Sequence, residues 1–284
     1  MNSKSYLFSA HKQASLWLDS FAYILGLNKN VHSKDNYTTI IFTHENIIDR
    51  NGNLLSKDLY SENLINSGWI NYNFKASSYY FNNNTNYVIY NLKYTNYEQS
   101  ILAMQDALFL LYKDAVLEGG FLLHAALVEK DGFGILLAGK GGAGKTTCCQ
   151  NAKDFFNVLC DDTVLVVKVL DKYFAHPFPT WSQYLLGESK KSWDMQKAVP
   201  IKAIFFLRKA KENKVTVVDK AKTVFFTNYL AHQVIGRWNK IYKNNLEKQL
   251  FFNICEFSKN TLAFILDFNL EGQFLTKIKE VING

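Results

Sequence analysis

A short stretch rich in glycine constrains this chain more than any other feature. Residues 139–147 read Gly-Lys-Gly-Gly-Ala-Gly-Lys-Thr-Thr, which contains the pattern G-x-x-x-x-G-K-[ST]. Glycines let the backbone curl so that successive N–H groups point toward phosphate oxygens, and a helix that starts there adds the positive end of its dipole. The pattern therefore predicts a nucleotide-binding loop that consists of Gly139, Lys140, Gly141, Gly142, Ala143, Gly144, Lys145, Thr146 and Thr147.

The residues on either side of this stretch fit the same interpretation. Upstream, residues 134–138 form a short apolar run that is typical of a buried strand, and residues 147–156 downstream can form a helix. In such a loop Lys145 reaches the β- and γ-phosphates, and the Thr146 hydroxyl is a ligand of Mg²⁺. Lys140 is a further candidate for a phosphate contact. A glycine-rich turn that matches by chance is the alternative, and the two flanks disfavour it.

Two adjacent aspartates form a second constellation. Asp161 and Asp162 follow the apolar residues 158–160, and one helix and one strand fill the interval from Lys145. We therefore expect the pair at the carboxyl end of a strand beside the loop, which is where α/β sheets bind ligands. One carboxylate can hold Mg²⁺, directly or through water, while its neighbour accepts a proton from an attacking hydroxyl. The alternative is a turn with two solvated aspartates.

Short apolar strands mixed with helices predict an α/β fold. We place a domain boundary near residue 118, with a small α+β module of unknown role over 1–118 and the nucleotide-binding domain over 119–284. In the second domain we expect strands at 121–128, 134–138, 157–160, 163–168, 201–207, 215–218 and 262–267, and helices at 147–156, 223–243 and 272–282.

The first 118 residues give weaker signals. Residues 1–27 predict an amphipathic helix that ends near Gly26 rather than a signal peptide. Residues 71–96 predict a loop that runs into a strand at 87–92. A capping box over 95–98 predicts the start of the next helix, and Gly119-Gly120 predicts its end.

Charge and cysteine content narrow the classes of function. The net charge of +7 is carried almost entirely by lysine, and the only arginines are Arg50, Arg208 and Arg237. Proteins that read bases usually rely on arginine, so we expect a solvated lysine-rich surface and no nucleic-acid partner; an acidic peptide or protein partner is an open alternative. The chain has no run of 18 apolar residues, so we expect no membrane span. The spacing of the four cysteines fits neither zinc nor disulfides, which predicts free thiols in the cytoplasm.

Three segments together carry a family resemblance. Residues 123–128 with a histidine in a strand, the loop at 134–147 and the aspartate pair at 159–162 resemble the core of HPr kinase/phosphorylase, a family with a PEP-carboxykinase-like nucleotide fold. The segment His176-Pro177-Phe178-Pro179-Thr180-Trp181-Ser182 resembles a divergent branch, the SynChlorMet cassette protein ScmC, which is linked to peptide-modification cassettes. The resemblance covers about residues 120–282 and is strongest over 123–182.

The resemblance implies roles for individual residues. Asp161 matches the general base that faces the acceptor hydroxyl, and Asp162 matches the residue that helps to place the metal, with Thr146 and Asp161 as further ligands. His124 matches a catalytic histidine near the phosphates, although a lone strand histidine is usually a hydrogen-bonded core residue. Thr146 replaces the usual serine of the family. The resemblance also implies ATP or GTP and Mg²⁺ as cofactors, and a homo-oligomer as an open alternative.

One departure from the family concerns the acceptor. The family has a downstream acidic segment with a metal ligand and an arginine-glycine pair, and residues 176–182 stand in its place here. We therefore do not expect HPr itself as the acceptor. Prolines fix this segment, and we expect it to be a loop that contacts the acceptor or the nucleotide through His176, Thr180 and Trp181; a purely structural loop is the alternative.

Three charged residues have two interpretations each. Arg208 and Arg237 could neutralise charge in the transition state, but at the end of a strand or in a helix each is more often a surface residue. Glu188 could be a stray metal ligand or a solvated charge. No further sequence signal decides between these interpretations.

These observations predict an ATP- and Mg²⁺-dependent kinase that transfers the γ-phosphate to a hydroxyl of a peptide, a protein or a small metabolite. A non-catalytic nucleotide-binding module, acting as a scaffold or sensor in a peptide-maturation complex, is the main alternative, and the missing acidic segment favours it. A motor or switch NTPase is weaker, because no water-positioning residue is identifiable.

Overall fold

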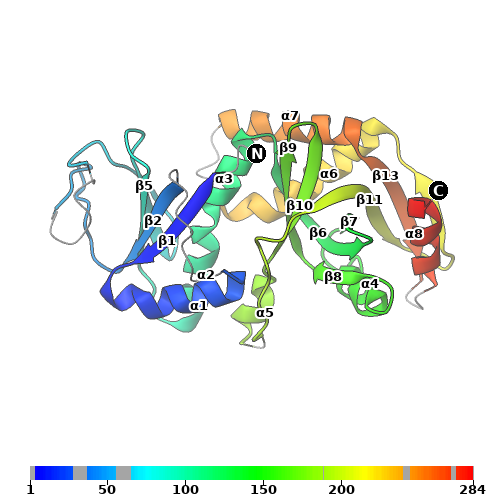
Figure 1. The fold of residues 1–284 in the computed structure, drawn as a ribbon, viewed down its shortest axis with the longest axis horizontal. Coiled ribbons are helices and arrows are strands. Elements are labelled where there is room, and N and C mark those ends of the chain that lie inside the picture. The colour runs from blue at the N-terminus through cyan, green and yellow to red at the C-terminus, as the bar shows by residue number, and fades with distance from the viewer. Residues whose placement is uncertain are drawn as a thin grey trace. The chain divides into compact units, whose positions relative to one another are not determined.

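The structure is a computed structural model that describes residues 4–27, 37–55, 65–187, 189–238, 244–269 and 273–283. Its fold is mixed α/β with two sheets, which confirms the predicted class at that level (Figure 1). The chain divides into two compact units, one of residues 1–109 with 181–191 and one of residues 110–180 with 192–284. Whether residues 1–118 and 119–284 form separate domains stays a prediction.

The first unit is built on a five-stranded sheet in the order β1-β2-β5-β4-β3. β1, β2 and β5 are parallel neighbours, whereas β4 pairs antiparallel with both β5 and β3. Aromatic rings fill its core: Trp17 and Phe21 lie with their ring centroids 4.9 and 6.0 Å from that of Phe42. The elements are β1 (Ser5–Ala10), η1 (Lys12–Ala14), α1 (Ser15–Leu25), β2 (Tyr37–Thr43), β3 (Ile70–Asn73), β4 (Ser77–Phe81), β5 (Tyr87–Leu92), α2 (Tyr97–Ala107) and α5 (Trp181–Leu185).

The prediction of one helix over residues 1–27 is wrong at its start. Ser5–Ala10 forms β1, because it pairs in parallel with β2 and this tertiary pairing outweighs the local pattern. α1 does end at Gly26 as predicted, and Gly26 adopts a φ of 62°, which favours glycine. The predicted loop over 71–86 is also wrong, since it contains most of β3 and all of β4, whose rings of Tyr72 and Tyr79 stack across the strands.

The cap of α2 is shifted by one residue from the predicted capping box. Asn96 is the N-cap, and its Oδ1 accepts a hydrogen bond of 2.9 Å from the Gln99 N–H. Gln99 Oε1 in turn accepts one of 3.0 Å from the Thr95 N–H, so the reciprocal pattern is present with Gln99 as partner. α2 ends at Ala107, and α3 (Phe109–Leu117) follows. The predicted glycines end α3, and a Cβ on Gly120 would lie 2.3 Å from the Val166 carbonyl oxygen.

The second unit is built on an eight-stranded sheet in the order β10-β9-β6-β7-β11-β13-β12, with β8 paired to β6 outside this order. β7, β11 and β13 are parallel neighbours, and the remaining pairs are antiparallel. The strands are β6 (Phe121–Lys130), β7 (Phe133–Ala138), β8 (Asn157–Cys160), β9 (Thr163–Val169), β10 (Lys172–Phe178), β11 (Val199–Lys209), β12 (Lys214–Val217) and β13 (Leu262–Phe268).

Helices cover both faces of this sheet. Phe205 of β11 belongs to the core that α4 and α8 also line, whereas the ring of Phe206 lies 5.1 Å from that of Phe226 in α6. Because consecutive strand residues point to opposite faces, α4 and α8 cover one face and α6 covers the other. The helices are α4 (Lys145–Ala152), α6 (Lys220–Ile235), η2 (Gly236–Trp238), α7 (Asn244–Asn260) and α8 (Phe274–Asn283).

Most strands predicted for this unit are present with similar bounds, and β10 is the exception. The sequence predicts a rigid loop at 176–182, but His176, Pro177 and Phe178 complete β10. Proline is tolerated there because β10 pairs with β11 only at Phe174 and Ala175, so the proline nitrogen faces an unpaired edge or strand end. α7 is not predicted. The last residues of the predicted helix 223–243, from 239 on, lie outside the described residues.

The structure describes all four cysteines. Each is a free thiol, as predicted, and burial raises the pKa of Cys148 and of Cys160 to about 12. Of the helices that the structure describes, none combines the length and the apolar character needed to cross a membrane.

Candidate functional site

The glycine-rich segment, residues 139–144, connects β7 to α4 and is called the glycine loop below. The Ala143 N–H closes it with a hydrogen bond of 3.0 Å to the Lys140 carbonyl. Gly142 and Gly144 have φ values of 75° and 103°, which other residues rarely adopt. A Cβ on Gly139 would lie only 2.7 Å from the Ala143 Cβ, so the tight curl needs glycine there. The predicted order of strand, loop and helix is present.

Lys145 opens α4, and its side chain turns back into the glycine loop. Its Nζ donates hydrogen bonds of 2.8 Å to the Gly139 carbonyl and 3.4 Å to the Lys140 carbonyl, and the residue is 6% exposed. Burial lowers the pKa of Lys145, and the negative charges of Asp162 and Asp161 partly offset this effect. Thr146 follows in the first turn of the helix and is exposed. A cation is thus held inside the loop while a hydroxyl faces solvent beside it.

Asp162 forms one end of a hydrogen-bonded chain that reaches α6. Its Oδ1 lies 3.2 Å from His124 Nε2, and His124 Nδ1 lies 2.9 Å from Gln233 Oε1. Burial alone would raise the pKa of Asp162, but the hydrogen bond and charge of His124, together with Lys145 and Thr163, lower it below its ordinary range. Asp162 is therefore a carboxylate at neutral pH. The predicted position of His124 beside the aspartates is observed, whereas Gln233 carries no sequence signal.

Asp161 has a different partner. Its Oδ1 accepts a hydrogen bond of 2.6 Å from the hydroxyl of Thr180, which is 5% exposed. Both β8, which ends just before Asp161, and β7 pair antiparallel with β6. The aspartates and the glycine loop therefore lie at the same edge of the sheet, as predicted. Two adjacent carboxylates there meet unlike surroundings: an imidazole for Asp162 and a neutral hydroxyl for Asp161.

The other predicted site residues are placed as follows. His176 Nδ1 lies 2.9 Å from the Met195 carbonyl oxygen, and burial lowers the pKa of this histidine. Trp181 begins α5 and belongs to the first unit. Arg208 pairs with Asp267 across β11 and β13. Glu188 and the side chain of Arg237 lie outside the described residues. Of the segment 176–182, only Thr180 has a contact with an aspartate of the site in the structure.

The residues of this edge suit a nucleotide with Mg²⁺ by their chemistry. The glycine loop is a curl that a side chain at Gly139 would fill, and it precedes a helix N-terminus, as in phosphate-binding loops. Carboxylate and hydroxyl oxygens are the ligands that Mg²⁺ prefers, usually one or two from the protein with the rest from phosphates and water. Within the described ranges no group of three or more His, Cys, Asp and Glu side chains could hold a metal alone.

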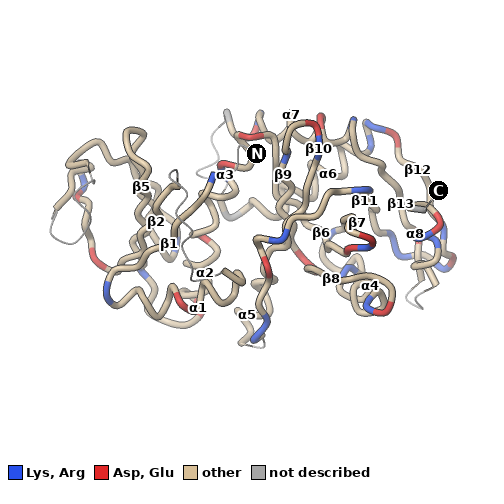
Figure 2. Tube along the Cα trace, viewed as in Figure 1, with Lys and Arg blue, Asp and Glu red and all other residues tan. Residues whose placement is uncertain are grey.

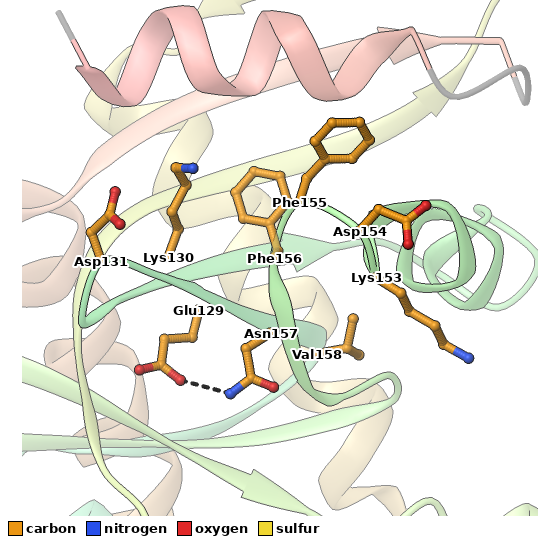
Figure 3. A pocket seen from close by; sticks show the side chains of 9 residues that line it. All are labelled: Glu129, Lys130, Asp131, Lys153, Asp154, Phe155, Phe156, Asn157 and Val158. Carbon is orange, nitrogen blue, oxygen red and sulfur yellow. Dashed lines mark hydrogen bonds between the residues drawn. The ribbon is translucent and has the colours of Figure 1, made fainter.

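A separate pocket of about 630 Å³ lies at the other end of α4 (Figure 3). None of the predicted site residues lines it. Figure 3 shows Glu129 accepting a hydrogen bond of 3.0 Å from Asn157, while Lys153, Asp154 and Phe155 stand at the exposed end of the helix. The C-terminal end of a helix carries the negative end of its dipole, so this pocket does not suit a phosphate group.

Comparison with known protein families bears on the identity of the chain. The sequence matches the family described as SynChlorMet cassette protein ScmC over residues 88–283. The chain belongs to this family. The match confirms the predicted resemblance to ScmC, and it begins in β5, before the residue at which we expect the resemblance to start. No curated protein matches the chain.

One solved structure that matches is the Hpr(Ser) kinase/phosphatase from Coxiella burnetii. The match covers 57% of this chain and 99% of that chain at 9% sequence identity, with a TM-score of 0.29. A match at this score carries no argument about the fold or the site of the ScmC family.

Proposed function

We propose that this chain is an ATP- or GTP-dependent phosphotransferase with a P-loop core of the HPr kinase and PEP-carboxykinase-like type. In this proposal it transfers the γ-phosphate, with Mg²⁺, to a hydroxyl of a peptide, a protein or a small metabolite. One observation carries the proposal: the glycine loop with Lys145 shares a sheet edge with two adjacent aspartates that have different hydrogen-bond partners.

The loop and its flanking residues would hold the nucleotide. Backbone N–H groups of residues 139–147 would bind phosphate oxygens, and Lys145, now bonded to loop carbonyls, would turn to the β- and γ-phosphates. Thr146 and Asp162 would hold Mg²⁺, with Asp161 within reach as a further ligand. Mg²⁺ supplies charge neutralisation on the transferring phosphate. His124 donates to Asp162 and keeps it anionic, which a metal ligand requires.

Asp161 would act as the general base. Thr180 occupies its Oδ1 and leaves the second oxygen for the hydroxyl of the acceptor. A base must lie within hydrogen-bond reach of the proton that it takes, and the Thr180 bond fixes the carboxylate for this purpose. As the acceptor oxygen attacks the γ-phosphate, its proton passes to Asp161 and the bond to the β-phosphate oxygen breaks.

The family name supports an acceptor in a peptide-modification pathway, because it refers to a cassette. We propose a cytoplasmic protein that acts on a peptide, protein or metabolite acceptor and not on nucleic acid or membranes. Lysines, arginines and acidic residues are interspersed along the trace of both units (Figure 2), and a homo-oligomer is compatible with this proposal.

The proposal is tested by transfer of labelled γ-phosphate. The full chain, Mg²⁺ and labelled ATP are incubated with an extract of the source cell, with Asp161→Asn in parallel. We expect label in one acceptor species with the wild type only. Tight binding of ATP without any labelled species would favour the non-catalytic scaffold or sensor. Absence of both binding and transfer would overturn the nucleotide site itself.

A further inference from the structure

Strand β11 ends beside the glycine loop. β7 and β11 are parallel neighbours, with Phe206 opposite Ala138, the last residue before the loop. Arg208 therefore lies two residues beyond the level at which the loop begins. The intervening Leu207 contacts the loop, since its Cβ lies 3.5 Å from the position of a Cβ on Gly139. The register thus places Arg208 at the loop edge of the sheet, on the side away from β6.

The guanidinium of Arg208 has a fixed orientation. Arg208 lies opposite Asp267 of β13 in the register, and its Nε and Nη2 donate to the two carboxylate oxygens, the latter over 2.7 Å. The hydrogen bond from Arg208 lowers the pKa of Asp267, which stays charged. The side chain of Asp267 is only 11% exposed, whereas that of Arg208 is 64% exposed. The pair uses two of the five N–H donors of the guanidinium.

Stability alone is a weak reason for this arrangement. An ion pair with an exposed partner contributes little to folding, typically less than about 1 kcal/mol. What the pair does achieve is a cation that is oriented in advance at the edge where the loop opens. The two sides of the loop then differ: Asp161 and Asp162 follow β8 on one side, and Arg208 ends β11 on the other.

We propose that Arg208, held by Asp267, contacts the phosphate chain of the bound nucleotide. This inference rests on the proposed function and extends it by one residue that the loop pattern does not contain. A guanidinium offers parallel donors that match two phosphate oxygens at once, which a lysine cannot do. Arg208 thus closes the phosphate site on the β11 side, across from the metal-holding aspartate.

The experiment is a calorimetric titration of the full chain with MgATP and MgADP. Arg208→Gln should weaken the binding of MgATP about tenfold, the loss expected for a charge-assisted hydrogen bond. Arg208→Lys should give an intermediate loss, because it keeps the charge without the fork. Lys211→Gln is the matched control: it removes the same charge from an exposed position in the same hairpin and should change the affinity less than about twofold.

Each outcome has one meaning. A loss confined to the Arg208 variants supports the contact. Equal affinity of wild type and Arg208→Gln overturns it while the proposed nucleotide site stands, and an equal loss in Lys211→Gln overturns it in favour of a general charge effect. If the wild type binds neither nucleotide, the proposed function fails before any variant is compared. Melting curves of each variant show that the fold is kept, as expected for an exposed side chain.

Discussion

The two ends of helix α4 both carry charged side chains, but they hold them differently. At the N-terminal end, Lys145 is 6% exposed and bonds to loop carbonyls, and Asp161 and Asp162 are each fixed by a partner from another element. At the C-terminal end, Lys153 and Asp154 are exposed and line an open pocket. The comparison teaches that oriented polar groups, rather than the volume of a pocket, mark the candidate site.

The largest effect should come from exchanging equivalent lysines at the two ends. Lys145→Ala removes the buried cation of the loop, and we expect the affinity for MgATP to fall on the order of a hundredfold, as for loss of a strong charge-assisted contact. Lys153→Ala removes the same charge from the exposed end and should leave the affinity unchanged. Calorimetry on both variants measures the difference. Equal losses would show that net charge, and not the loop, binds the nucleotide.

A smaller effect should come from Thr180, which fixes Asp161. Thr180→Val keeps the shape of the side chain and removes the donor, so transfer should slow about tenfold through misplacement of the base while the affinity for MgATP stays the same. Thr180→Ser keeps the donor and should restore most of the rate. The pair is compared in the labelled-phosphate assay at saturating ATP. A serine variant as slow as the valine variant would remove the hydroxyl from the account.

The shape of the loop can be tested apart from its charge. Gly139→Ala places a Cβ 2.7 Å from the Ala143 Cβ, so the loop must shift, and overpacking of this kind costs about 1–3 kcal/mol. Gly141→Ala is the control, because a Cβ there has no atom within 4 Å. We expect a lower melting temperature for the first variant only. Similar melting curves for both would show that the curl tolerates a side chain at its start.

The smallest effect concerns pH at the pocket end. The hydrogen bond from Lys197 lowers the pKa of Glu129 below its ordinary 4.5, with help from Asn157 and against burial. A lowered pKa in the folded state means that Glu129 stabilises the fold above pH 4.5 and loses this contribution as the pH falls through its folded-state pKa. The melting temperatures of wild type and Glu129→Gln should therefore differ near neutral pH and converge in acid. Transfer should be the same in both at neutral pH.

Local signals explain which parts of the site were predictable. The glycine loop and the aspartate pair are contiguous patterns, and each follows an apolar run that forms a buried strand, so their shared edge follows from the sequence. Gln233 comes from a helix 109 residues away from His124 along the chain, and no pattern announces that contact. Thr180 is predicted to belong to the site, but its bond to Asp161 depends on the pairing of β10 with β9.

The fold shows the same division. Strands with continuous apolar runs, such as β7 and β8, are predicted with nearly correct bounds. β10 contains a proline and β1 precedes a true helix, so the local signal favours a loop and a longer helix, respectively. Both strands exist because they pair with partners that are distant or not recognisable in the sequence. Tertiary pairing, which a single sequence does not display, therefore accounts for these two errors.

The most direct test of the account compares the two aspartates. Transfer of the γ-phosphate and binding of ATP, with and without Mg²⁺, are measured for Asp161→Asn and Asp162→Asn. The account predicts that Asp161→Asn binds MgATP within about twofold of wild type but transfers no phosphate, because only the base is lost. It predicts that Asp162→Asn loses the gain in affinity that Mg²⁺ provides. Transfer at the wild-type rate by Asp161→Asn would contradict the account.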